Sequence, residues 1–85
     1  MNLTLLDGHY RPEDARTLIT ELLRVKIAFH QRRIEAHKTE EDIKHSEKRI
    51  RELEASLQAA LRELRDATGW IDMRAIASIE VNPPR

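Results

Sequence analysis

The stretch His37-Lys38-Thr39-Glu40-Glu41-Asp42 decides the fold of this chain, because it either interrupts one long helix or lies within it. A threonine followed by three acidic residues is typical of a helix start, where the hydroxyl caps a backbone N–H group and the carboxylates face the positive end of the helix dipole. From residue 13 to residue 68 the chain has neither glycine nor proline. We therefore predict two helices, at 12–37 and 40–68, joined by a tight polar turn near 37–39.

A heptad pattern supports the alternative of one continuous coiled-coil helix. Starting at Ala15, an apolar residue recurs at every seventh position as far as Leu64, without a change of register. The pattern is weak in its middle, because Arg32, Thr39 and Ser46 occupy successive d positions, where a coiled coil needs apolar side chains. We prefer the antiparallel, coiled-coil-like hairpin, and the continuous rod stays open as the alternative.

Short segments with strand character flank the helical middle. Leu3, Thr4 and Leu5 alternate in polarity, and the pair Asp7-Gly8 that follows is typical of a turn, so we predict a strand and turn over 1–11. A second strand is predicted at 74–81, where alternate residues are apolar and Pro83-Pro84 follows. The expected fold is mainly α, a single domain with the order β-α-α-β.

The second helix is expected to stop in Ala67-Thr68-Gly69-Trp70. A glycine just after the last apolar residue of a helix is typical of a Schellman motif, in which the glycine takes the left-handed conformation and terminates the helix. We therefore place the end of the second helix at Thr68 and expect a positive φ angle at Gly69.

The first predicted helix carries more apolar surface than the second can cover. At 100° per residue, one stripe holds Ala15, Leu18, Ile19, Leu22, Val25 and Phe29, and a second stripe holds Leu23, Ile27, His30 and Ile34. Together they span roughly 200°, against roughly 120° on the second helix. Each large apolar side chain left in water forgoes about 1.5–3 kcal/mol. We therefore predict a homodimer, a four-helix bundle whose interface is formed by Leu23, Ile27, His30 and Ile34. The alternative is a monomer in which the strands and Trp70 cover Leu23 and Ile27.

The sequence offers no arrangement typical of catalysis. There is no cysteine for a thiolate nucleophile or a cysteine-based zinc site, and each of the two glycines stands alone, which rules out a glycine-rich phosphate loop. His37, Glu41 and His45 would share one face of a continuous helix, but the predicted turn breaks that spacing and charged residues surround it. We predict no enzymatic activity, no metal site and no cofactor.

The charge balance argues against nucleic acid and membranes as partners. Fifteen basic and fifteen acidic residues give a formal net charge of zero, so the chain has no overall field that attracts anionic surfaces. A basic strip near the hairpin tip, with Arg32-Arg33 and Lys48-Arg49, supports the alternative of a small dimeric nucleic-acid-binding regulator. No apolar run approaches the roughly 18 residues that span a bilayer. We expect a cytoplasmic, non-enzymatic, self-associating protein-interaction or structural module.

Three segments resemble a group of small uncharacterised bacterial proteins. They are Leu5-Leu6-Asp7-Gly8-His9-Tyr10-Arg11-Pro12-Glu13-Asp14-Ala15, Lys26-Ile27-Ala28-Phe29-His30 and Lys48-Arg49-Ile50-Arg51-Glu52-Leu53. The resemblance implies a strand, a helical hairpin and a final strand, and it favours the hairpin over the rod. It implies no activity, ligand or catalytic residue.

Overall fold

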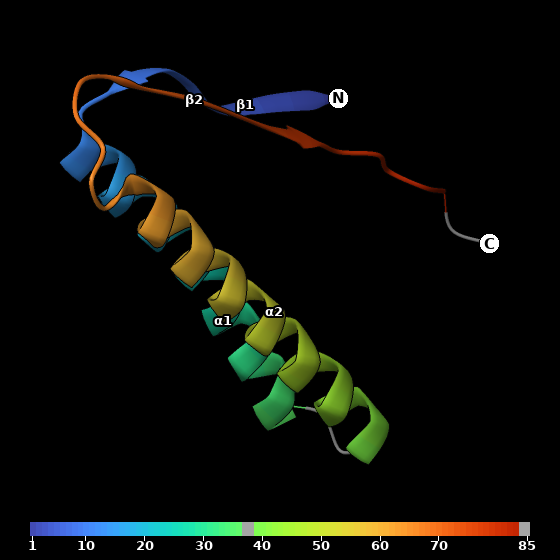
Figure 1. Cartoon of the computed structure of the whole chain (residues 1–85). Coiled ribbons are helices and arrows are strands. Elements are labelled where there is room, and N and C mark those ends of the chain that lie inside the picture. The colour runs from blue at the N-terminus through green and yellow to red at the C-terminus, as the bar shows by residue number, and fades with distance from the viewer. Residues whose placement is uncertain (37–38, 84–85) are drawn as a thin grey trace.

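Two antiparallel helices and a two-stranded sheet make up the chain. The computed structural model describes residues 1–36 and 39–83. The elements follow in the order β1 (Asn2–Tyr10), α1 (Pro12–Ala36), α2 (Glu40–Leu64) and β2 (Ile71–Ser78), as Figure 1 shows. The predicted β-α-α-β hairpin is confirmed, and the continuous coiled-coil rod is wrong. The predicted turn includes His37 and Lys38, which lie outside the described residues.

The start of α2 has the cap that the sequence predicts. Thr39 has an extended backbone, with φ −97° and ψ 139°, and its hydroxyl oxygen accepts a hydrogen bond from the Asp42 N–H group at 3.3 Å. Glu40, Glu41 and Asp42 occupy the first turn, where the helix dipole favours negative charge. The cap therefore satisfies a backbone group that would otherwise be unpaired, and it fixes the point at which the chain reverses.

The end of α2 differs from the prediction. The helix stops at Leu64 rather than Thr68, and the chain then tightens, with the N–H groups of Arg65 and Ala67 bonded to the carbonyl oxygens of Arg62 and Leu64 at 3.4 and 3.2 Å. Gly69 has the expected positive φ, 84°, but it lies beyond the helix end. Gly69 therefore turns the connection into β2 and does not cap the helix.

The two strands pair antiparallel along their whole length. Gly8 lies opposite Met73, so the predicted Asp7-Gly8 turn is wrong: both residues belong to β1, because pairing with β2 overrides the local turn preference. Leu5 is an extra residue between the paired Thr4 and Leu6, a β-bulge. The second strand begins three residues earlier than predicted, at Ile71 instead of residue 74, and ends at Ser78 instead of residue 81.

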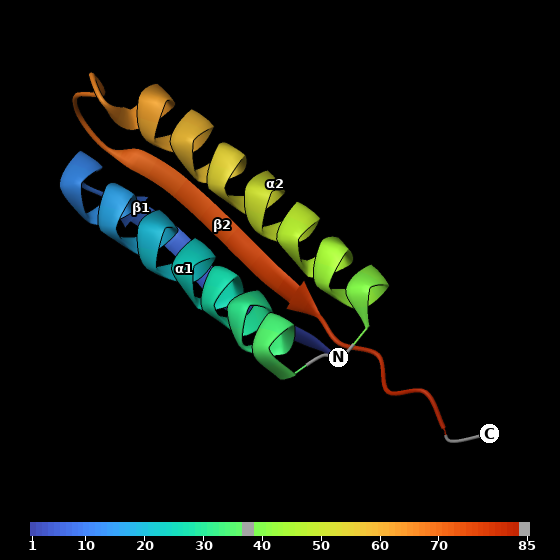
Figure 2. The same cartoon turned by 90° about the horizontal axis from the view of Figure 1, so that it is seen from below.

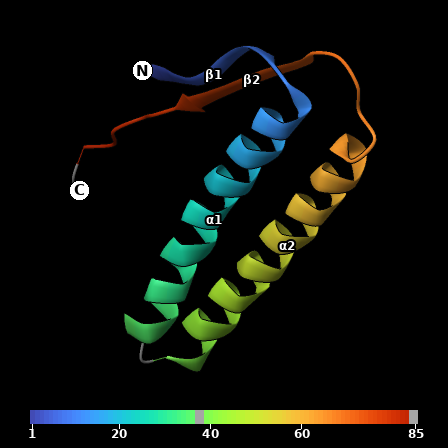
Figure 3. The same cartoon turned by 90° about the vertical axis from the view of Figure 1, so that its left-hand side faces the viewer.

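The sheet lies over the hairpin and diverges from it. Seen from below, β2 runs along the line between α1 and α2, and β1 lies behind α1 (Figure 2). The views in Figures 1 and 3 show the strands leaving the helices at an angle, so that the two layers are closest where β1 enters α1 and α2 leads to β2. The molecule measures 47 × 29 × 14 Å, with a Cα radius of gyration of 15.9 Å. A compact chain of this length has a radius of about 12 Å, so the fold is extended.

The buried core is small for a chain of this size. Among the described residues, the buried hydrophobic side chains are Ala15, Leu53 and Leu57, and Ser46 is buried with them. Ser46 was expected to weaken the seam at its d position, but a small side chain there lets the helices approach closely. The contact between α1 and α2 therefore supplies most of the core, and the sheet touches α1 at only a few positions.

Replacement of Thr39 by alanine should lower the free energy of unfolding by about 1 kcal/mol, because the Asp42 N–H group loses its acceptor. Urea unfolding followed by circular dichroism measures the change. Thr17→Ala is a matched control. Thr17 lies away from the ends of α1 and is exposed to solvent, and its hydroxyl donates to the Glu13 carbonyl oxygen at 3.0 Å. The control should keep the parent stability, and an equal loss in both variants would contradict the capping role.

Candidate interaction surface

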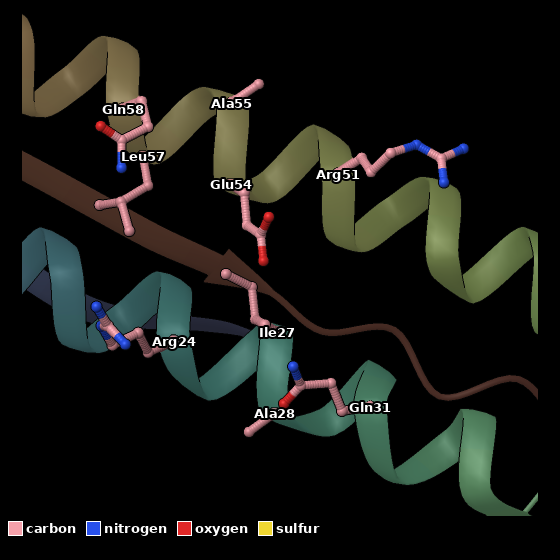
Figure 4. A pocket seen from close by; sticks show the side chains of 9 residues that line it. All are labelled: Arg24, Ile27, Ala28, Gln31, Arg51, Glu54, Ala55, Leu57 and Gln58. Atoms are coloured by element: carbon pink, nitrogen blue, oxygen red, sulfur yellow. The ribbon is translucent and has the colours of Figure 1, made fainter.

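A groove with polar and apolar side chains lies between the two helices. It is lined by residues of α1 and α2: Arg24, Ile27, Ala28, Gln31, Arg51, Glu54, Ala55, Leu57 and Gln58. In Figure 4, Ile27 and Glu54 point toward each other across the groove, and Leu57 points into it from α2. Apolar side chains flanked by one carboxylate, two amides and two guanidinium groups are typical of a seam between packed helices. The groove does not bring together a nucleophile and a base.

A polar pair stands on the outer side of the sheet. The His9 Nδ1 atom contacts an Asp72 carboxylate oxygen, and these residues lie opposite each other on β1 and β2. Their side chains are 74% and 77% exposed, so water screens the pair and its contribution to stability is small. Trp70 is nearby, and the Arg11 guanidinium lies 6.0 Å from its ring centroid. The four side chains thus gather at the junction between helices and sheet, where they are largely exposed.

The basic strip predicted near the hairpin tip is mixed with acidic partners. On α2, Lys44 pairs with Glu40 at 3.2 Å, and Arg49 pairs with Glu52 at 2.8 Å. These pairs lower the local positive potential that a phosphate backbone would need. Among residues 1–36 and 39–83 there is no group of three His, Asp or Glu side chains that could hold a metal ion. The sequence analysis considered His37, Glu41 and His45 as a possible metal-binding set, and His37 lies outside these ranges.

The four residues predicted to form a dimer interface are half-buried within their own chain. Ile27 lies in the groove with Leu57 of α2, and His30 lies near Arg49 and His45 of α2. Leu23 and Ile34 are also half-buried. Most of this stripe therefore faces α2 in the single chain, and its part in a dimer stays a prediction.

A cleft separates α1 from the sheet. Its apolar lining comes from both layers, namely Leu6, Ile19, Leu22, Leu23, Met73 and Ala75. The alternation along β2 explains this lining: Ile71, Met73, Ala75 and Ala77 are half-buried, and the residues between them are exposed. The sheet thus directs its apolar face toward α1 without closing on it.

Apolar side chains of α1 form a flank beside this cleft. We call Leu18, Leu22, Val25 and Phe29 the α1 flank; Leu18 is half-buried and the other three are exposed. Leu22, Val25 and Phe29 are 37%, 67% and 47% exposed, respectively. Toward its C-terminal end, α1 lies farther from the diverging sheet (Figure 3). The sequence assigned these residues to the first of two apolar stripes, but periodicity gave no means of deciding which stripe α2 covers.

An aromatic and cationic cluster borders the α1 flank. The Arg33 guanidinium lies 5.6 Å from the centroid of the Phe29 ring, and the His30 ring meets the same ring edge-on at 5.5 Å. Arginine often covers an aromatic face in this way, which leaves its charged end available to an anionic partner.

Comparisons of the chain with protein-family models, with curated proteins and with solved structures give no match. The resemblance to small bacterial hairpin proteins therefore stays a prediction. In the described part of the chain, neither helix combines the length and apolar character that a membrane span requires.

The environment of His30 disfavours its charged form. The Nδ1 atom is shielded from solvent and has no hydrogen-bond partner among the described residues. Burial lowers the pKa of His30 below the ordinary value of 6.5, and nearby positive groups on both helices lower it further, namely Arg49, Arg33, Lys26 and His45. The unfolded chain therefore binds a proton at His30 more readily than the folded chain does. The resulting stability is present above pH 6.5 and is lost as the pH falls toward the lowered value.

Stability should accordingly fall between pH 7.5 and pH 5.5, and His30→Gln should reduce that fall, because glutamine does not titrate. Urea midpoints at the two pH values, measured at one protein concentration, give the comparison. His9→Gln is the control, since His9 is exposed on β1 and is not one of the groups that lower the pKa of His30. A fall that is as steep in His30→Gln as in the parent would contradict the assignment.

Proposed function

We propose that this protein is a non-enzymatic, self-associating module whose functional unit is a dimer of helical hairpins. The observation that carries the proposal is the amount of surface that the single chain leaves in water. It is supported by the small core and by the apolar α1 flank.

The accessible surface of the chain is much larger than its mass predicts. It measures 7104 Å², whereas a folded monomer of 10.0 kDa is expected to expose about 5,200 Å². The excess, about 1,900 Å², is more than the roughly 800 Å² that each partner buries in a standard protein interface, but it lies within the roughly 1,000–2,500 Å² that each partner buries in an obligate homodimer. An extensive interface with one copy of the same chain could therefore cover the excess.

The α1 flank is the part of this surface best suited to a second copy, and we propose it in place of the predicted interface, whose residues are half-buried in their own chain: Leu23, Ile27, His30 and Ile34. Phe29 and Val25 project from a regular helix of 25 residues, and a helix is a rigid support for an interface. Aromatic side chains such as Phe29 dominate the energetics of protein interfaces, because each one buries a large apolar area. Two hairpins that met along this flank would form a four-helix bundle.

The charge pattern favours a protein partner over nucleic acid. The basic residues of α2 are interspersed with Glu40 and Glu52, with which they pair, and the net charge is zero. Salt-dependent retention on immobilised DNA or RNA would favour the nucleic-acid-binding regulator instead.

Substitution of both Val25 and Phe29 by glutamate should convert a dimer of about twice 10.0 kDa into a monomer, as measured by sedimentation equilibrium. The helices should remain formed, because both side chains are exposed in the single chain. Ala59→Glu is the matched control: it adds a charge at an exposed position of α2, away from the flank, and should leave the mass unchanged.

A parent protein that is folded and monomeric at micromolar concentration would overturn the self-association. A double variant with the parent's dimeric mass would overturn the assignment of the interface to the α1 flank. Circular dichroism of each variant separates dissociation from unfolding.

A further inference from the structure

The residues along the α1 flank follow a symmetric spacing. Starting at Asp14 and ending at Arg33, the series Asp14, Leu18, Leu22, Val25, Phe29 and Arg33 has intervals of four, four, three, four and four residues. At 100° per residue all six positions lie within a sector of about 100°. The series reads the same in both directions, with an acidic residue at one end, a basic residue at the other and apolar residues between them.

Such a series is complementary to itself when two helices run antiparallel. If the midpoints of two α1 helices coincide, Asp14 lies opposite the partner's Arg33, Leu18 opposite the partner's Phe29, and Leu22 opposite the partner's Val25. A two-fold axis between the helices repeats each pair. The apolar residues then meet apolar residues, and opposite charges close both ends of the seam.

We infer that a second copy of this chain docks antiparallel on α1 in this register. The inference rests on the proposed self-association and adds the direction, the register and the two ion pairs that fix them. The four apolar flank residues of each copy fill the seam between the two α1 helices. In the resulting four-helix bundle, the two α1 helices contact each other and each α2 helix packs on the outer side of its own α1.

Electrostatics selects the antiparallel direction. A parallel pair would place Asp14 against the partner's Asp14 and Arg33 against the partner's Arg33, and juxtaposed like charges are unfavourable. The antiparallel pair also sets Asp14, in the acidic first turn of one helix, beside Arg33, in the last turn of the other, so that the helix dipoles are opposed.

In the single chain, charged side chains already lie at the two ends of the α1 flank. Arg33 lies over the Phe29 ring at 5.6 Å, which places its charge at the end of the flank. Asp14 is exposed, and the structure shows no ion pair at its carboxylate among the described residues. Both charges are therefore available to a partner at the ends of the apolar series.

A charge-exchange experiment tests the register. Asp14→Arg and Arg33→Asp each replace two attractions in the dimer by two repulsions, and each should weaken self-association at least about tenfold in sedimentation equilibrium. An equimolar mixture of the two variants should restore a mixed dimer with nearly the parent's dissociation constant, because each repulsive site then meets its opposite. Differently tagged variants identify the mixed species.

Glu13→Arg is the matched control. It changes the charge of the same first turn and disturbs the helix dipole equally, but Glu13 lies on the opposite side of the helix from the flank. It should leave the dissociation constant within about twofold of the parent value, since its charge does not face the seam.

Three results would overturn the inference: single variants that dimerise like the parent, a mixture that stays as weak as its components, or an equal loss in Glu13→Arg. The Val25 and Phe29 double variant distinguishes an error in the proposed interface from an error in the proposed register. If it is monomeric while the charge variants behave like the parent, the flank is the interface and the register is wrong. If it is dimeric, the flank itself is not the interface.

Discussion

The packing of α1 against α2 is the interaction on which the rest of the structure depends. Leu53 and Leu57 are buried on α2, and Ala15 is the buried residue of α1. The Thr39 cap sets the point at which α2 begins. The sheet is held together mainly by its own backbone pairing, and it meets the helices near Arg11 and Trp70. It therefore adds little to the stability of the hairpin. A two-stranded sheet is marginal in water without support from other elements.

A core this small limits what one chain can do alone. The net stability of a small domain is only a few kcal/mol, and it comes largely from apolar burial. Here α1 uses one side against α2 and leaves Val25 and Phe29 in water, and the diverging sheet leaves its own apolar face partly open. The unequal width of the apolar faces of the two helices thus links the fold to the proposed function. The same surface that weakens the monomer is the surface that a second copy would cover.

The sequence predicted the hairpin and the start of α2 well, because Thr39 and the three acidic residues after it act locally. It predicted the two apolar stripes of α1 but not their partners, since periodicity gives directions around a helix and not what lies in each direction. The turn predicted at Asp7-Gly8 is wrong for a similar reason: these residues favour a turn locally, and only pairing with the distant strand β2 makes them part of a strand. The angle between sheet and helices depends on the short connections at Arg11 and Gly69, and no pattern in the sequence specifies it.

The concentration dependence of thermal unfolding measures directly whether self-association stabilises the fold. If a second copy completes the structure, dissociation accompanies unfolding, and mass action raises the unfolding midpoint as the protein concentration increases. We predict a steady rise of several degrees between about 1 and 100 μM. A sharp cooperative transition with the same midpoint at both concentrations, together with a solution mass near 10.0 kDa, would contradict the account.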